Sequence, residues 1–99
     1  MPKPQILASA WEDISAIAQF HMQNVGPRSA KAVTDALLNA IDLLEDMSEL
    51  GPIHHDAVLA AQGYRKLIVK RYVCVYRVID GTATIYRVFH ESSSYEKHL

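Results

Sequence analysis

The sequence contains only one cysteine, Cys74, so no disulfide can form within the chain. Cys74 stands in a segment of alternating apolar residues, and this setting predicts a buried, unreactive thiol rather than a nucleophile. The chain does not open with a basic segment followed by an apolar run, which is the pattern of a secretory signal. We therefore expect a cytoplasmic protein.

Long hydrophobic runs and an excess of charge of one sign are also missing. No apolar stretch approaches the roughly 20 residues that cross a bilayer, which argues against membrane insertion. The 10 lysine and arginine residues are balanced by 11 aspartate and glutamate residues, for a net charge of −1. This balance argues against a large electrostatic footprint for nucleic acid, which is bound through many basic contacts to phosphate. The composition, 49% hydrophobic and 21% charged over 99 residues, predicts one globular domain covering residues 1–99.

Two amphipathic helices are predicted in the N-terminal half. Ser9 and Glu12 have the spacing of a capping box, so we expect the first helix to begin there. Its apolar residues recur every three or four positions until Gly26 and Pro27 break the helix. A second amphipathic helix is expected to start at Pro27 and to end at Gly51. Such a pair forms an antiparallel hairpin that must bury its apolar stripes against another layer.

The C-terminal half predicts a three-stranded antiparallel meander. Its strands are interrupted near Lys70 and Arg71 and again at the Asp80–Gly81 pair, which is a strong two-residue hairpin signal. Residues 3–7 can add a short strand, and the prolines in that segment restrict it to the edge of the sheet.

A regular hairpin at Asp80–Gly81 divides the side chains of the sheet between two faces. We assign the more apolar face to the helices and expect Arg65 and Arg87 on it to pair with acidic helix residues such as Asp13 or Asp42. That face comprises Leu67, Val69, Tyr72, Cys74, Tyr76, Val78, Ala83, Ile85 and Phe89. The other face carries hydrogen-bond donors among valines, which suits a protein partner. Its predicted partner-binding residues are Lys66, Val73, Val75, Arg77, Tyr86, Val88 and His90.

The histidines do not indicate a metal site. His21 lies on the apolar stripe of the first helix with no second ligand four residues away, which predicts a hydrogen-bonded, partly buried histidine. His54, His55 and Asp56 are adjacent, but no third and fourth ligand accompanies them, so we expect a solvated loop. Gly63 lacks the neighbouring glycines of a phosphate-binding loop, so nucleotide binding is not expected. We expect neither a metal nor a cofactor.

The segment "YRKLIVKRYVCVYRVIDGTATIYRVFH", preceded by helices that open with "ASAWEDISAIAQF", resembles the toxins of the RelE/ParE superfamily of bacterial toxin–antitoxin modules. The resemblance covers nearly the whole chain and rests on Arg65, the second strand "YVCVYRV" and the closing "RVFH". It implies an α+β fold in which an N-terminal helical hairpin packs on a small antiparallel β-sheet. It also implies a cognate antitoxin that folds on binding and wraps the toxin, with growth arrest and plasmid stabilisation as the biological effects.

The resemblance is greater to the ParE-like branch, whose members inhibit DNA gyrase and need an interface rather than a phosphate site. Arg65 in its R-x-L-x-V setting, Arg77 and the "YRVFH" ending are more similar to this branch. DNA gyrase is therefore the predicted target. A non-toxic relative that only binds its antitoxin is an alternative, because the serine-rich ending "ESSSY" departs from the pattern of the branch.

RelE-like members provide the other alternative, because they are ribosome-dependent mRNA endonucleases with cations or general acid and base groups around the scissile phosphate. Tyr64 and Val73 stand where such nucleases carry basic residues. If the chain is a nuclease, the resemblance implies the catalytic residues Lys66, Arg77, His90 and Tyr95.

Overall fold

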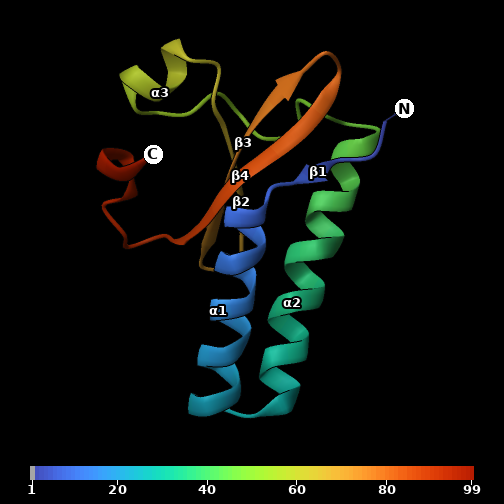
Figure 1. The fold of residues 1–99 in the computed structure, drawn as a ribbon, viewed down its shortest axis with the longest axis vertical. Coiled ribbons are helices and arrows are strands. Elements are labelled where there is room, and N and C mark those ends of the chain that lie inside the picture. Colours follow the sequence, from blue (N-terminus) through green and yellow to red (C-terminus); the bar gives the residue numbers. More distant parts are fainter. Residues whose placement is uncertain (1) are drawn as a thin grey trace.

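The computed structural model describes residues 2–99. Its N-terminal half forms the predicted helical hairpin (Figure 1). Helix α1 spans Ala8–Asn24 and helix α2 spans Pro27–Asp42, and a 3₁₀ turn, Leu43–Glu45, continues α2. Pro27 is placed in the first turn of α2, where its missing N–H leaves no helical bond unmade. The helices run side by side, and α2 ends earlier than the expected limit at Gly51 because the chain tightens into the 3₁₀ turn.

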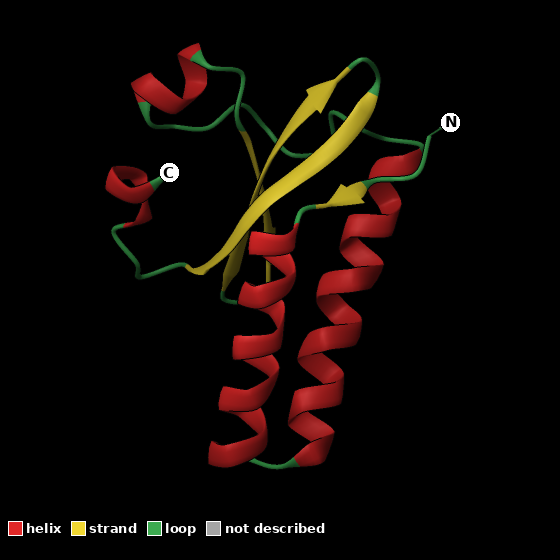
Figure 2. Ribbon diagram, in the orientation of Figure 1, coloured by secondary structure: helices red, strands yellow, loops and turns green. Residues whose placement is uncertain are grey.

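The C-terminal half forms the predicted meander with strands β2 (Arg65–Val69), β3 (Tyr72–Ile79) and β4 (Thr82–His90). The edge strand β1 (Gln5–Ile6) pairs in parallel with β4, so the sheet order is β1-β4-β3-β2 (Figure 2). The structure confirms the α+β class, the helical hairpin and the antiparallel meander. The parallel β1 makes the complete sheet mixed rather than purely antiparallel.

A β-bulge in β4 changes which side chains share a face. Ile79 pairs with Thr82 and Tyr76 pairs with Ile85, as a regular hairpin requires, but Val75 then pairs with Arg87. Tyr86 is therefore the additional residue of the bulge. Because side chains alternate along a strand, one added residue transfers every following side chain of β4 to the opposite face.

The predicted faces of Arg87, Val88, Phe89 and His90 are wrong for this reason. Arg87 was expected on the helix side but pairs with Val75, which belongs to the second core. Val88 pairs with Cys74 and lies in the core beneath the helices, whereas Phe89 pairs with Val73 on the other face. His90 pairs with Tyr72 and lies on the helix side of the sheet. A bulge has no unambiguous local sequence signal, so a regular register was the natural expectation.

The predicted capping box is also wrong. Helix α1 begins at Ala8 after Leu7, and no side chain caps it. The hydroxyl of Ser9 instead donates to the carbonyl of Tyr86 at 2.7 Å. Ser9 therefore binds the bulge of β4 rather than the N-terminus of its own helix.

The sheet separates two apolar cores. The larger core lies between the sheet and the helical hairpin. Its most deeply buried side chains are Leu37, Ile41, Leu44, Cys74, Tyr76 and Ile85. The smaller core lies on the opposite face, where a short helix α3 (Ala57–Ala61) and a C-terminal 3₁₀ turn, Tyr95–His98, cover the strands (Figure 1).

This second core contradicts the prediction of an open sheet face. Val73 and Val75 are buried beneath Leu59 and Tyr95, so they do not reach solvent in the isolated chain. The cover begins with Asp56, whose carboxylate accepts the N–H of Leu59 and caps α3. The loop at His54–Asp56, which was expected to be solvated, therefore includes the N-cap residue of α3. Within residues 2–99, no helix is both long enough and apolar enough to cross a membrane.

Candidate partner-binding surfaces

Lys66, Arg77 and Tyr86 remain together on the sheet face that carries the second core. The guanidinium of Arg77 lies over the rings of Tyr64 and Tyr86, at 5.3 and 5.7 Å from their centroids. The Nζ atom of Lys66 lies 2.9 Å from Nδ1 of His55. The two aromatic faces stabilise Arg77 in one position and leave it half-buried, so it can contact a partner at the rim of this face.

Arg65 and Arg87 have structural partners. Nε and Nη2 of Arg87 donate to the carboxylate of Asp13 at 2.7 and 3.1 Å, as predicted, and these bonds raise the pKa of the guanidinium. Arg65 does not bind an acidic side chain, contrary to prediction. Its Nη1 donates to the carbonyl oxygens of Gly51 at 2.8 Å and Glu49 at 3.3 Å. Arg65 reaches these carbonyls because the loop that contains Gly51 passes close to β2 and β3. Only glycine fits at position 51, because a Cβ added there would lie 2.5 Å from the carbonyl oxygen of Lys66.

The four residues of the nuclease alternative lie in different environments. His90 is on the helix side, next to Tyr72, whereas Lys66 and Arg77 belong to the opposite face. Tyr95 is only 3% exposed, and its hydroxyl lies 2.6 Å from Nε2 of His54. Burial raises the pKa of this phenol. The fold therefore does not gather these four side chains around one position for a phosphate.

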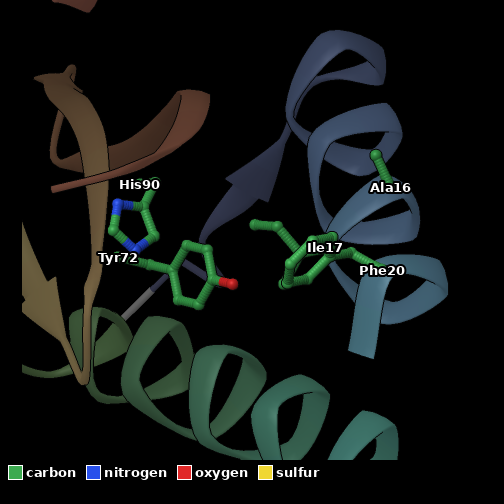
Figure 3. A pocket seen from close by; sticks show the side chains of 5 residues that line it. All are labelled: Ala16, Ile17, Phe20, Tyr72 and His90. Atoms are coloured by element: carbon green, nitrogen blue, oxygen red, sulfur yellow. The ribbon is translucent and has the colours of Figure 1, made fainter. Parts of the chain in front are cut away.

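A hollow of about 360 Å³ lies between α1 and the ends of β3 and β4. Figure 3 shows the hydroxyl of Tyr72 directed toward α1, with Ile17 and Phe20 facing it from the helix and His90 beside it on β4. The residues lining the hollow are Ala16, Ile17, Phe20, Tyr72 and His90. Its walls are mainly apolar and aromatic, which suits an apolar side chain of a partner.

His21 fixes the position of the Tyr72 side chain. Nε2 of His21 lies 2.9 Å from the hydroxyl of Tyr72, and Nδ1 lies 2.8 Å from the hydroxyl of Ser29 on α2. The prediction of a hydrogen-bonded, partly buried His21 is confirmed. A second hollow of about 320 Å³ adjoins this cluster and adds Lys70 and Arg71, so positive charge lies beside the apolar groove.

The exposed C-terminal part of α1, which includes the groove residue Phe20, has the composition of an interface. Phe20 is 59% exposed, and Met22 and Val25, which do not line the groove, are 50% and 73% exposed. Residues 14–27 contain no aspartate, glutamate, lysine or arginine. Depletion of charge with enrichment in aromatic residues and methionine is typical of the centre of a protein interface. The lack of charge in residues 14–27 is visible in the sequence, but the amphipathic pattern predicts only which side of the helix is buried.

Metal binding and thiol chemistry have no support in the described part of the chain. Among the side chains that the structure describes, those of residues 2–97 and 99, no group of three or more histidine, cysteine, aspartate or glutamate residues is arranged to hold a metal ion. Cys74 is fully buried, as predicted, and burial raises the pKa of its thiol to about 12. A thiol that is neutral and inaccessible cannot serve as a nucleophile.

Comparison with known proteins identifies the family. The model of the "ParE toxin of type II toxin-antitoxin system, parDE" matches residues 5–95. The chain belongs to the ParE toxin family. The predicted resemblance and the assignment to a toxin–antitoxin system are therefore confirmed.

The fold comparison agrees with this ParE family assignment. A solved structure described as the chromosomal ParDE TA system from P. aeruginosa has a TM-score of 0.73 at 18% identity, and the match covers 89% of this chain and 96% of that chain. At this identity the likeness establishes the shared fold alone. The search of curated proteins found no match.

Proposed function

We propose that this ParE-family toxin inhibits DNA gyrase in the cytoplasm and is neutralised by a cognate antitoxin. The separation of Lys66, Arg77, His90 and Tyr95 supports an interface-based activity over RNA cleavage. Positioned groups must lie within hydrogen-bond reach of the same substrate to act together as acid, base and charge stabiliser. His90 lies on the helix side, away from Lys66 and Arg77, and the buried hydroxyl of Tyr95 is bonded to His54, so these groups do not surround one phosphate.

The groove between α1 and the ends of β3 and β4 is the proposed docking site for the antitoxin. An uncharged helix surface with Phe20 at its centre can bury an apolar side chain, and Lys70 at the rim favours an acidic residue beside it. Arg71 at the same rim is paired with the carboxylate of Glu91 at 3.0 Å. His90, from the predicted partner-binding set, belongs to this groove. Lys66, Arg77 and Tyr86 form a separate proposed contact surface on the other face. Val73, Val75 and Val88 are buried in the isolated chain and would need a rearrangement to contact a partner.

Expression of the chain alone in bacteria tests the proposed activity. DNA-damage signalling and messenger cleavage are measured in the same cells, and the purified chain is added to a gyrase supercoiling assay. Growth arrest with DNA breaks, intact messengers and inhibited gyrase is the expected result. Arrest with messengers cut within translated codons would overturn the gyrase proposal and support the RelE-like nuclease. Expression without arrest would support the non-toxic relative that only binds antitoxin.

Replacement of Phe20 by aspartate tests the proposed docking site. The new charge would have to be buried by the antitoxin, so Phe20→Asp should weaken binding by at least about tenfold while the chain remains folded. Val58→Asp is the matched control, because Val58 is also exposed but lies on α3, away from the groove. Equal binding by both variants in a titration with purified antitoxin would contradict the assignment of the groove.

A further inference from the structure

The C-terminal segment, residues 91–99, is held on the sheet mainly through Tyr95. The Tyr95 ring stacks on Phe89 with centroids 4.6 Å apart and planes at 8°. It covers Val73 and Val75 in the second core. Glu91 is itself held on β3, because its N–H donates to the Arg71 carbonyl at 2.8 Å and its carboxylate accepts from the Arg71 guanidinium at 3.0 Å. The Ser93 N–H donates to the His90 carbonyl at 3.0 Å, so the contacts of the following turn hold the chain from residue 94 onward.

His54 supplies the buried polar contact of this segment and is only 2% exposed. The backbone N–H of Asp56 donates to Nδ1 of His54 at 3.0 Å. Because a backbone N–H can only donate, Nδ1 must be unprotonated. The neutral ring then carries its proton on Nε2 and donates it to the hydroxyl of Tyr95 at 2.6 Å. The observed contacts therefore require an uncharged imidazole.

Protonation would place a second N–H on Nδ1, directed at the N–H of Asp56. The charged and titratable groups around the ring come from three elements: His55 and Asp56 from the same loop, Lys66 from β2, and Glu96 from the C-terminal turn. Burial, with the positive charges of His55 and Lys66, lowers the pKa of His54, and this outweighs the opposing effect of Asp56 and Glu96. The ring is neutral at neutral pH, in agreement with the geometry.

We propose that His54 is a proton-sensitive anchor that controls access to the sheet face beneath the C-terminal segment. Protonation turns the Asp56 bond into two N–H groups directed at each other, so the ring has to turn away from this position. The turn moves Nε2 away from the hydroxyl of Tyr95, which releases Tyr95 and uncovers Val73, Val75 and Phe89. Val73 and Val75 belong to the partner-binding face predicted from the sequence. In this scheme that face is available when the segment is released and is closed when His54 is neutral. The inference depends on the docking contacts alone and not on gyrase inhibition.

The direction of the pH dependence follows from the lowered pKa. A released His54 has the ordinary pKa of 6.5, so the released state binds more protons than the docked state below that pH. Docking is at full strength above pH 6.5 and weakens as the pH falls through this value toward the lower pKa of the docked ring.

Backbone amide relaxation of residues 91–99, measured by NMR on the purified full-length chain between about pH 5 and about pH 8, tests the proposal. We expect an ordered segment at the upper end and a gain in fast motion at the lower end while α1 and α2 stay ordered. His54→Gln keeps an N–H donor for Tyr95 but cannot be protonated, so it should remove the pH dependence. His55→Gln is the matched control and should retain it.

Three results would overturn the proposal. One is equal order of the segment across the pH range in the unmodified chain. The others are retention of the pH dependence in His54→Gln and its loss in His55→Gln, because either would show that His54 is not the group responsible. If His54→Gln does not fold, the titration of the His54 ring is measured in the unmodified chain. A ring pKa below 6.5, with a coincident shift of the Tyr95 resonances, is then required, and a value at or above 6.5 refutes the anchor.

Discussion

At the residue scale, Asp13 joins helix α1 to the part of β4 that follows the bulge. Its carboxylate accepts two bonds from Arg87 and a third from the backbone N–H of Val88 at 2.9 Å. The side chain of Asp13 is largely buried, at 16% exposed, whereas that of Arg87 is 35% exposed, so the Val88 N–H depends on this carboxylate more than the guanidinium does. The sequence predicted the partner of Arg87 correctly although it placed Arg87 on the wrong face. The long arginine reaches around the edge of the sheet to the helix.

Replacement of Asp13 by alanine should lower the free energy of unfolding by about 2 kcal/mol, because it leaves the guanidinium and a backbone N–H without an acceptor. Urea denaturation monitored by circular dichroism measures the change. Asp35→Ala is the control, since Asp35 forms an exposed pair with Lys31 one helical turn away. That variant should lose no more than about 0.5 kcal/mol. Similar losses in both variants would mean that the Asp13 contacts contribute little.

At the element scale, the bulge at Tyr86 determines the composition of both cores. Before it, β4 presents Ala83 and Ile85 to the helices, and after it Val88 takes over this role. A regular strand would instead direct Phe89 and Arg87 toward the helices and leave Val88 on the other face. The hydroxyl of Ser9 stabilises the bulge by binding the Tyr86 carbonyl. This hydrogen bond from α1 thus stabilises a bulge that the sequence of β4 does not predict.

Deletion of Tyr86 should leave the protein folded, with a melting temperature within about 10 °C of that of Tyr86→Ala, because it removes the residue of β4 that has no partner on β3 and keeps Arg87 to His90 opposite their present partners. Tyr86→Ala is the matched control, since it removes the ring but keeps the number of residues in β4. It should retain the native far-ultraviolet circular dichroism spectrum and lose the ring contacts with Arg77 and Tyr64. A deletion variant that unfolds while the alanine variant stays folded would contradict the assignment of Tyr86 as the additional residue of the bulge.

At the scale of the whole molecule, the sheet is covered on both faces and its central strands are inaccessible. Cys74 on β3 is enclosed between the strands and the helical hairpin, and burial raises its thiol pKa to about 12 from an ordinary value of 9.0. The thiolate forms only when the protein opens. Above about pH 9 this contributes to instability, because the unfolded thiol ionises where the folded one does not.

Cys74 should therefore resist thiol reagents in the native protein and react at once in denaturant. The measurement is the rate of colour release from an aromatic disulfide reagent at about pH 8, with the same sample in concentrated urea as the control. The native rate should follow the unfolding equilibrium as urea is added. A fast native reaction that does not depend on urea would show that the helices leave the sheet without global unfolding.

The sequence by itself determined the helical hairpin, the meander, the two-residue turn at Asp80–Gly81, the buried thiol and the family. These features depend on local periodicity, turn residues and motif order, which are present in the order of the residues. Only the tertiary structure decided the bulge, the contact between His54 and Tyr95, and the groove beside Phe20. Each depends on contacts between residues far apart in the chain: His54 and Tyr95 are 41 positions apart, and Ser9 and Tyr86 are 77 apart. A local pattern cannot specify such contacts, because they form only when helices and strands from both halves of the chain pack together.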